Sequence, residues 1–262
     1  MTEPVLILTM KWGTLYGPDY VNNLARGVRQ NLSRPHRFIC FTDDATGLDA
    51  GIEALPLPDL GLPPGHKDSR WRKLALFRRD LAGLSGTALF LDLDLVVTGS
   101  LDPFFDLPGE FLIIRDDDLF RPKPLRKLNP ARDAFLHSVG NSSVFRYTVG
   151  AQAYILDAFL ADPAAATAGY EISQQFQSAQ LAKHGQLAYW PRGWCVSFKN
   201  DVVPRGFASY LRDPALPEGA RIVVFAGNPK MDVALTGGGQ KWYRRIGDVS
   251  WLRRLWEQGR DR

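Results

Sequence analysis

The chain has 262 residues, of which 45% are hydrophobic and 23% charged, a composition typical of a globular protein with a sizeable core. Its net charge of +4 is matched by residues 241–262, where seven Lys or Arg residues accompany three Asp or Glu residues, so the remainder is neutral overall. This distribution argues against a general nucleic-acid-binding protein.

The sequence predicts a cytoplasmic protein with reduced thiols. No apolar stretch approaches the roughly 20 residues that span a bilayer. The first residues, Met1–Pro4, lead directly into apolar Val5–Leu8, without the pattern of a secretory signal. The two cysteines, Cys40 and Cys195, each lie in an apolar setting, which favours two buried free thiols over a disulfide or a thiolate metal site.

The first third of the chain alternates between strand and helix patterns. We expect a strand at Val5–Thr9, a helix at Asp19–Asn31, and strands at Arg37–Thr42 and Ile52–Leu57, an order that favours a sheet with helices on its faces. The loop Met10–Pro18 carries Lys11, Trp12 and Tyr16. These side chains suit a grip on a nucleotide base and a phosphate; the alternative is that the aromatic rings only cover the sheet edge.

A basic helix is expected after the Pro/Gly-rich linker Leu60–Lys67. From Ser69, a suitable N-cap, Trp71, Leu74, Phe77 and Leu81 recur at helical spacing. Most of its cations fit a solvated face. Arg70 and Lys73 are the candidates for reaching a diphosphate, because they lie on its first turns.

Two carboxylates interrupt the most apolar run of the chain, Ala88–Val97. This run predicts one buried strand, on which Asp92 and Asp94 point to the same face. Two buried carboxylates repel each other, and a hard divalent cation such as Mg²⁺ or Mn²⁺, shared with phosphate oxygens, relieves the repulsion. The pair therefore predicts a metal–diphosphate site at the carboxyl end of a central strand. The alternative is a strand end with two capping carboxylates.

The second half continues the same alternation. The polar stretch Asp116–Arg132 is a candidate substrate loop, and its three leading carboxylates also fit a solvated turn. Strands are expected at Phe111–Arg115, Asn141–Tyr147, Leu187–Trp190, Trp194–Lys199 and Arg221–Phe225, and helices at Gly150–Leu160 and Glu171–His184. A tight loop with Lys230 follows the last strand. Finally, Trp251–Trp256 predicts an amphipathic helix that either caps the domain or lies on an anionic membrane surface.

Six segments together resemble one enzyme group. They are Lys11-Trp12-Gly13, Arg70–Lys73, Leu91-Asp92-Leu93-Asp94, Asn141-Ser142-Ser143-Val144, Gln174-Gln175 and Phe225–Lys230. In order and spacing, over residues 4–232, they resemble bacterial glycosyltransferases of the GT-A type, in the glycogenin-like and lipopolysaccharide galactosyltransferase group.

The resemblance implies an α/β fold with a mixed, mainly parallel central sheet flanked by helices. Residues 1–240 would form one domain, with a nucleotide-binding half at about 1–115 and an acceptor-binding half at about 116–240. Residues 241–262 lie beyond the resemblance; their own pattern predicts a basic amphipathic C-terminal helix, a candidate for peripheral contact with the inner membrane surface.

The resemblance also implies a function. Such an enzyme moves a sugar from a nucleoside diphosphate donor, a UDP-sugar, to a glycan or lipid-linked acceptor in polysaccharide biosynthesis, with help from Mn²⁺ or Mg²⁺. Asp92 and Asp94 would hold the metal, and Asn141 and Gln175 would face the donor sugar or acceptor. The donor nucleotide would be bound by Thr9, Lys11, Trp12, Tyr16, Arg70, Lys73, Asp92 and Lys230.

The sequence departs from the group's pattern at two points. The group's closing segment carries a His as third metal ligand, whereas Val224, Phe225 and Ala226 occupy the candidate positions here, so the metal would rely on the two aspartates, phosphate oxygens and water, or on Asp232. Gln174 also stands where the group has an acidic residue. The alternatives are a sugar-phosphate nucleotidyltransferase and a catalytically inactive nucleotide-sugar-binding protein.

Overall fold

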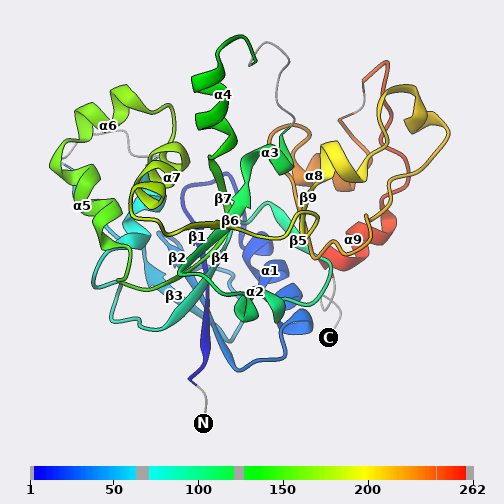
Figure 1. Cartoon of the computed structure of the whole chain (residues 1–262). Coiled ribbons are helices and arrows are strands. Elements are labelled where there is room, and N and C mark those ends of the chain that lie inside the picture. Colours follow the sequence, from blue (N-terminus) through cyan, green and yellow to red (C-terminus); the bar gives the residue numbers. More distant parts are fainter. Residues whose placement is uncertain (1–2, 63–70, 121–126, 240, 258–262) are drawn as a thin grey trace.

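The computed structural model describes residues 3–62, 71–120, 127–239 and 241–257, and its centre is a seven-stranded sheet (Figure 1). The strand order is β3 (Ile52–Pro56), β2 (His36–Thr42), β1 (Val5–Lys11), β4 (Thr87–Leu91), β7 (Gly140–Thr148), β6 (Phe111–Arg115) and β8 (Leu187–Tyr189). Only β7 runs antiparallel to its neighbours, so β4 and β6 point the same way. The predicted mixed, mainly parallel sheet is confirmed.

A second, three-stranded sheet lies beside the first. It consists of β5 (Leu95–Val97), β10 (Ile222–Val224) and β9 (Cys195–Ser197), with β10 antiparallel to β5 and parallel to β9. The prediction of one continuous strand over Ala88–Val97 is therefore wrong. The chain leaves the central sheet after Leu91 and enters the second sheet at Leu95, because the partner strand changes between these two residues.

Helices cover both faces of the central sheet, because its strands are apolar on both sides. In β1, Leu6 and Leu8 face one layer and Ile7 faces the other, as the two-residue period of a strand requires. The first layer contains α5 (Ala153–Ala161) and α7 (Ser173–Lys183), and the second contains α1 (Pro18–Asn31). These helices agree with the sequence-based expectations to within a few residues.

The predicted helix from Ser69 to Leu81 is also wrong in its described part. Residues 63–70, and with them Ser69 and Arg70, lie outside the described residues, and a short 3₁₀ helix, η1 (Arg72–Phe77), follows Trp71. Arg78 then turns to extended backbone. Leu74–Phe77 are buried without exception, so this segment has no solvent face of the kind that a longer amphipathic helix needs.

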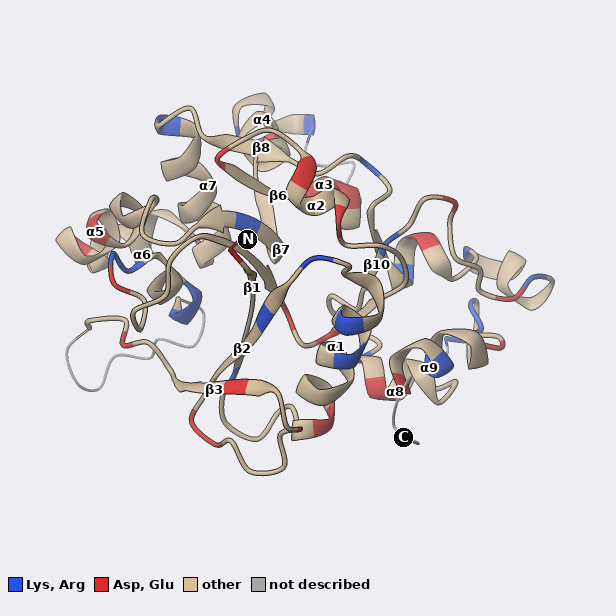
Figure 2. Cartoon of the chain, turned by 90° about the horizontal axis from the view of Figure 1, so that it is seen from below, with Lys and Arg blue, Asp and Glu red and all other residues tan. Residues whose placement is uncertain are grey.

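The C-terminal helix caps the domain. Helix α9 (Ser250–Glu257) packs beside α1 and α8 (Met231–Leu235), as Figure 2 shows from below. Leu252 is fully buried, and Trp256 meets Tyr20 edge-on with ring centroids 5.4 Å apart. The helix is shorter than the predicted span of 241–262, because residues 241–249 form a turn and extended chain and residues 258–262 lie outside the described part. Trp251, Leu255 and Trp256 are partly covered, so most of its apolar face packs against the domain rather than facing outward.

The remaining elements are short. They are α2 (Pro103–Asp106), α3 (Asp116–Leu119), α4 (Pro130–His137), α6 (Pro163–Gly169), the π-helical turn η3 (Phe198–Val202) and the 3₁₀ turn η4 (Gly206–Tyr210). Helix α3 lies within the predicted substrate loop 116–132 and α4 begins in it, whereas residues 121–126 are outside the described part. None of the described helices is long and apolar enough to cross a bilayer.

Both thiols are free and buried, as predicted. Cys40 lies on β2 of the central sheet, and Cys195 lies on β9 of the second sheet. Burial raises the pKa of the Cys40 thiol to about 12 and raises the pKa of Cys195 as well. The two sheets therefore each contain one un-ionised thiol.

Candidate active site

Asp92 and Asp94 lie on the three-residue joint between β4 and β5. The backbone N–H of Asp92 donates to the Ser143 carbonyl of β7 at 2.9 Å. The Phe225 N–H, just after β10, donates to the Asp94 carbonyl, also at 2.9 Å. One aspartate is thus fixed by the central sheet and the other by the second sheet.

The two carboxylates have different partners. The Lys73 ammonium lies 2.7 Å from Asp92 Oδ2 and also donates to the Ser142 carbonyl at 3.2 Å. The Tyr16 hydroxyl donates to Asp94 Oδ2 at 3.3 Å. Burial, followed by the charge of Asp92, raises the pKa of Asp94 to about 6. Burial also raises the pKa of Tyr16, so its hydroxyl remains a hydrogen-bond donor.

A cleft of about 220 Å³ opens at this joint. Its lining combines apolar and aromatic side chains with one cation and two carboxylates: Met10, Trp12, Leu15, Tyr16, Lys73, Asp92, Leu93 and Asp94. The loop that follows β1 is tied to the end of β2, because Gly13 N–H donates to Asp43 at 2.9 Å. Five of the predicted site residues therefore share one cleft, drawn from three separate parts of the chain.

Three other predicted donor-binding residues are described and do not line this cleft. Thr9 is fully buried within β1, and its hydroxyl has no hydrogen-bond partner among the described residues. The Lys11 ammonium is buried and donates to the Asp44 carbonyl at 3.0 Å, away from the cleft lining. Arg70 lies outside the described residues. Lys230 is exposed just before α8, close enough for its charge to lower the pKa of Asp94.

A second polar cluster lies at the same edge of the central sheet. Asp116 immediately follows β6, which is parallel to β4, so Asp116 and Asp92 leave the sheet at the same edge. Asp116 Oδ1 accepts from the side-chain amides of Asn141 and Gln174, each at 3.1 Å. Asn141 Oδ1 in turn accepts from the Ser143 N–H at 3.1 Å.

Lys73 connects this cluster to the aspartate pair. Its ammonium bonds both Asp92 and the Ser142 carbonyl, while the Ser142 N–H donates to Gln174 Oε1 at 3.4 Å. Asn141 is therefore in the site, but its amide holds Asp116 and Ser143 rather than standing free.

Gln174, not Gln175, faces this cluster. The side-chain oxygen Oε1 of Gln175 accepts from the Glu171 N–H at 3.1 Å and so closes the start of its own helix, α7. The sequence interpretation placed Asp116 only in a candidate substrate loop and assigned no role to the Gln174 amide. The position of Asp116 directly after a predicted strand was an available signal. The orientation of the two glutamines was not, because it depends on where α7 begins.

The aspartate pair suits a divalent cation that is shared with a ligand. Carboxylate oxygens are the hard donors that Mg²⁺ and Mn²⁺ prefer, and the raised pKa of Asp94 marks a pair whose charge Lys73 only partly compensates. Among the described residues, no group of three His, Cys, Asp or Glu could hold a metal. Phe225, at a candidate third-ligand position, stacks on Phe198 with centroids 4.5 Å apart. A cation here would need phosphate oxygens or water to complete its shell.

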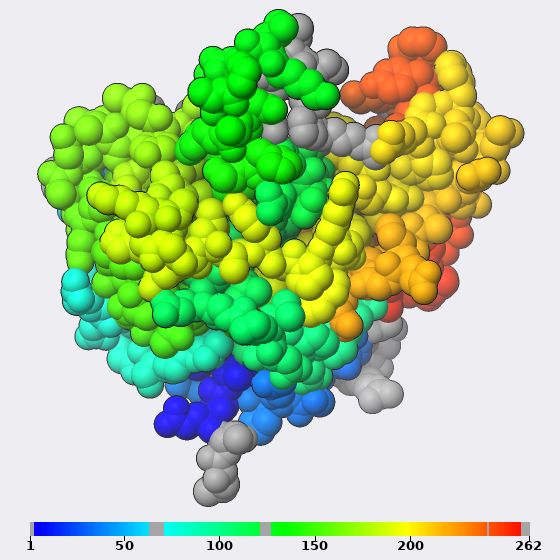
Figure 3. Space-filling view, in the orientation of Figure 1, coloured from blue at the N-terminus to red at the C-terminus, as the bar shows by residue number. Residues whose placement is uncertain are grey.

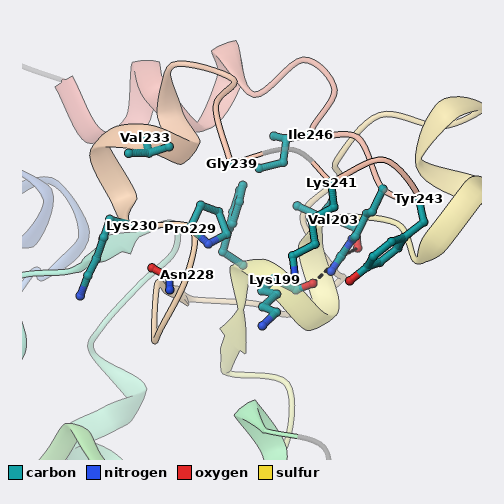
Figure 4. A pocket seen from close by; sticks show the side chains of 12 residues that line it. Lys199, Val203, Asn228, Pro229, Lys230, Val233, Gly239, Lys241, Tyr243 and Ile246 are labelled. Atoms are coloured by element: carbon teal, nitrogen blue, oxygen red, sulfur yellow. Dashed lines mark hydrogen bonds between the residues drawn. The ribbon is translucent and has the colours of Figure 1, made fainter.

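A second cavity, of about 290 Å³, lies in the lobe formed by the second sheet (Figure 4). Its walls are mainly apolar, with Val203, Pro229, Val233 and Ile246 among them. Lysines line it as well: Lys199, Lys230 and Lys241. Lys230 thus lines this cavity and also lies close enough to Asp94 for its charge to lower the pKa of that carboxyl.

Comparisons with known proteins identify the fold. No family model matches the sequence, and no curated protein matches it. The galactosyltransferase LgtC, solved in complex with donor and acceptor sugar analogues, superposes with a TM-score of 0.60 and 14% identity, over 96% of this chain and 95% of that one. An active-site mutant of LgtC gives 0.59 and 13% identity, over 95% and 94% of the two chains.

The bifunctional glycosyltransferase WbbM superposes with a TM-score of 0.56 and 10% identity, over 98% of this chain and 52% of that one. At these identities the structural similarity establishes the fold alone, so a function has to be argued from the residues of the site.

Proposed function

We propose that this chain, which has the GT-A fold of these glycosyltransferases, transfers a sugar from a nucleoside diphosphate donor to a hydroxyl group of a glycan or lipid-linked acceptor. We take the donor to be a UDP-sugar. The observation that carries the proposal is the aspartate pair on the joint between the two sheets, in a cleft with aromatic walls and the Lys73 ammonium.

Each part of the cleft has a task in donor binding. The rings of Trp12 and Tyr16 offer flat surfaces for the base. Lys73 and Lys230 carry the positive charge that a diphosphate needs. Asp92 and Asp94 would hold Mn²⁺ or Mg²⁺, which, when bound, stabilises the negative charge that develops on the departing nucleoside diphosphate.

The second polar cluster would bind the sugar. Asp116, Asn141 and Gln174 present a carboxylate and two amides, which match the donors and acceptors of sugar hydroxyls. Because these residues lie at the same sheet edge as Asp92, the transferred sugar would lie between them and the diphosphate. The apolar cavity with its lysines is suited to the acceptor side.

Calorimetric titration with UDP tests this proposal. We expect binding in the presence of Mn²⁺ that chelator weakens. The isosteric change Asp94→Asn should weaken it by about tenfold or more, because a charged ligand oxygen is lost. Asp157→Asn, which removes an exposed carboxylate paired with Arg79 outside the cleft, is the matched control and should bind as the unmodified protein does.

Two outcomes would contradict the proposal: no UDP binding in any metal, or equal binding by the Asp94→Asn protein. Release of UDP from UDP-sugars then separates an enzyme from a nucleotide-sugar-binding protein, since only an enzyme shows turnover. The three solved structures described above are glycosyltransferases, which favours the transferase over the nucleotidyltransferase alternative.

A further inference from the structure

An exposed apolar patch lies on the lobe of the second sheet, away from the cleft. We call it the aromatic patch; it consists of Phe207, Tyr210, Leu211 and Trp242, with exposed fractions of 66%, 48%, 86% and 81%. Side chains of this size are usually buried, and a contiguous exposed group of them marks an interaction surface.

The aromatic patch is held together by contacts between two distant segments of the chain. The Tyr210 hydroxyl donates to the Trp242 carbonyl at 3.0 Å, and the Arg245 N–H donates to the buried Ser209 hydroxyl at 2.8 Å. The Phe207 ring lies 6.3 Å from Tyr210 and 6.2 Å from Trp242, between centroids. These bonds fix the two segments together while the rings remain in solvent. The gold and orange segments of Figures 1 and 3 form this outer end of the lobe.

Cations surround the aromatic patch. Arg205, Arg212, Lys241 and Arg245 are exposed beside it, and none of them forms an ion pair with another described residue. Two exposed aspartates, Asp213 and Asp248, also lie next to these segments, and the Asp213 carboxylate accepts from the Asp248 N–H. Positive charge around exposed rings is complementary to an anionic phospholipid surface, where the rings enter the headgroup layer and the cations meet phosphates.

We propose that the aromatic patch docks this protein peripherally on an anionic membrane surface. The patch replaces α9 as the contact, since most of the apolar face of α9 packs against the domain itself. Lys241, beside Trp242, also lines the apolar cavity of Figure 4, so docking would bring that cavity to the membrane. The proposal stands independently of transferase activity, because its test measures binding to lipid.

Vesicle co-sedimentation of the full chain tests whether the apolar side chains of the aromatic patch contribute to membrane binding. We expect it to sediment with vesicles of phosphatidylcholine and phosphatidylglycerol, less so as salt is raised, and not with phosphatidylcholine alone. The double change Leu211→Ser and Trp242→Ser should lower the partition coefficient by about tenfold or more, because two large side chains no longer enter the lipid. Leu128→Ser, at another apolar side chain that is 80% exposed, is the control and should leave partition unchanged.

Charge reversal separates the aromatic patch from α9. Lys241→Glu with Arg245→Glu should weaken binding to anionic vesicles, whereas Arg253→Glu with Arg254→Glu on α9 makes the same change in charge and should have a much smaller effect. Equal binding to neutral vesicles, or no loss on changing Leu211 and Trp242, would overturn the proposal. So would absent vesicle binding combined with self-association that these changes abolish, since the patch would then join copies of the chain.

Discussion

At the residue scale, the two aspartates of the joint have different surroundings, although they are only two positions apart. Asp92 has Lys73 as a close counter-ion, whereas Asp94 has a neutral phenol and is largely removed from water. The free-energy cost of burying two neighbouring negative charges therefore arises mainly at Asp94. A cation or a buried proton at Asp94 relieves that cost, and the two compete.

This asymmetry predicts how stability depends on pH in chelator. The pKa of Asp94 is about 6 in the folded protein against 3.8 for an unperturbed carboxyl, so the folded state holds the proton more tightly. Its contribution to the free energy of unfolding is therefore fully present below about pH 4 and is lost as the pH rises through 6. We expect a loss on the order of 2 kcal/mol across this window relative to Asp94→Asn, which cannot titrate.

Urea denaturation of both proteins at several pH values measures this difference. Asp157→Asn, changed outside the cleft, should follow the unmodified protein throughout. Parallel pH curves for the unmodified and Asp94→Asn proteins would show that Asp94 is not destabilised by burial.

At the element scale, the two errors of sequence interpretation have one cause. Leu74–Phe77 and the apolar residues around Asp92 are all buried, and the contacts that bury them are not visible in the spacing of apolar and charged residues. Where one face is polar, as in α1 or α9, the period predicted the helix and its buried side correctly. The break at Asp92 is set by pairing with β7 and by the approach of Phe225, contacts that lie far along the chain.

The capping role of α9 predicts a contrast between two leucines. Leu252 is fully buried in the cluster beneath the second sheet, whereas Leu255 is only partly covered. Leu252→Ala should lower the free energy of unfolding by about 3 kcal/mol, because it leaves a cavity in a packed core. Leu255→Ala is the matched control with the same change of side chain, and about 1 kcal/mol is expected.

Chemical denaturation measures both leucine variants. Similar losses would mean that α9 packs less closely than described. A negligible loss of unfolding free energy for Leu252→Ala would instead indicate that α9 is detached from the domain. Its apolar face could then contact a membrane.

At the scale of the whole molecule, the layered α/β fold could be predicted from strand and helix periods alone. The aspartate pair could be predicted too, because two charged residues inside an apolar run can be recognised in the sequence without knowing which residues they contact. The contacts of Asp116 with Asn141 and Gln174 could not, because they join residues 25 and 58 positions apart. The partner of Lys11 could not be predicted either, because nothing in the sequence of its loop indicates that its ammonium donates to the Asp44 carbonyl.

The two thiols provide a separate reporter for each sheet. Only the thiolate reacts quickly with an alkylating reagent, and burial with a raised pKa suppresses it at Cys40 and Cys195 alike. Each cysteine becomes labelled only when its own sheet opens. The second sheet has three short strands against seven in the central one, so we expect Cys195 to be labelled faster than Cys40.

Peptide masses after timed alkylation give the two labelling rates. Equal rates would show that the sheets open as one cooperative unit, and faster labelling of Cys40 would contradict the expected order. A ligand that bridges Asp92 and Asp94 should slow both cysteines together, although it touches neither, because the joint that it binds is a direct connection between a strand of each sheet.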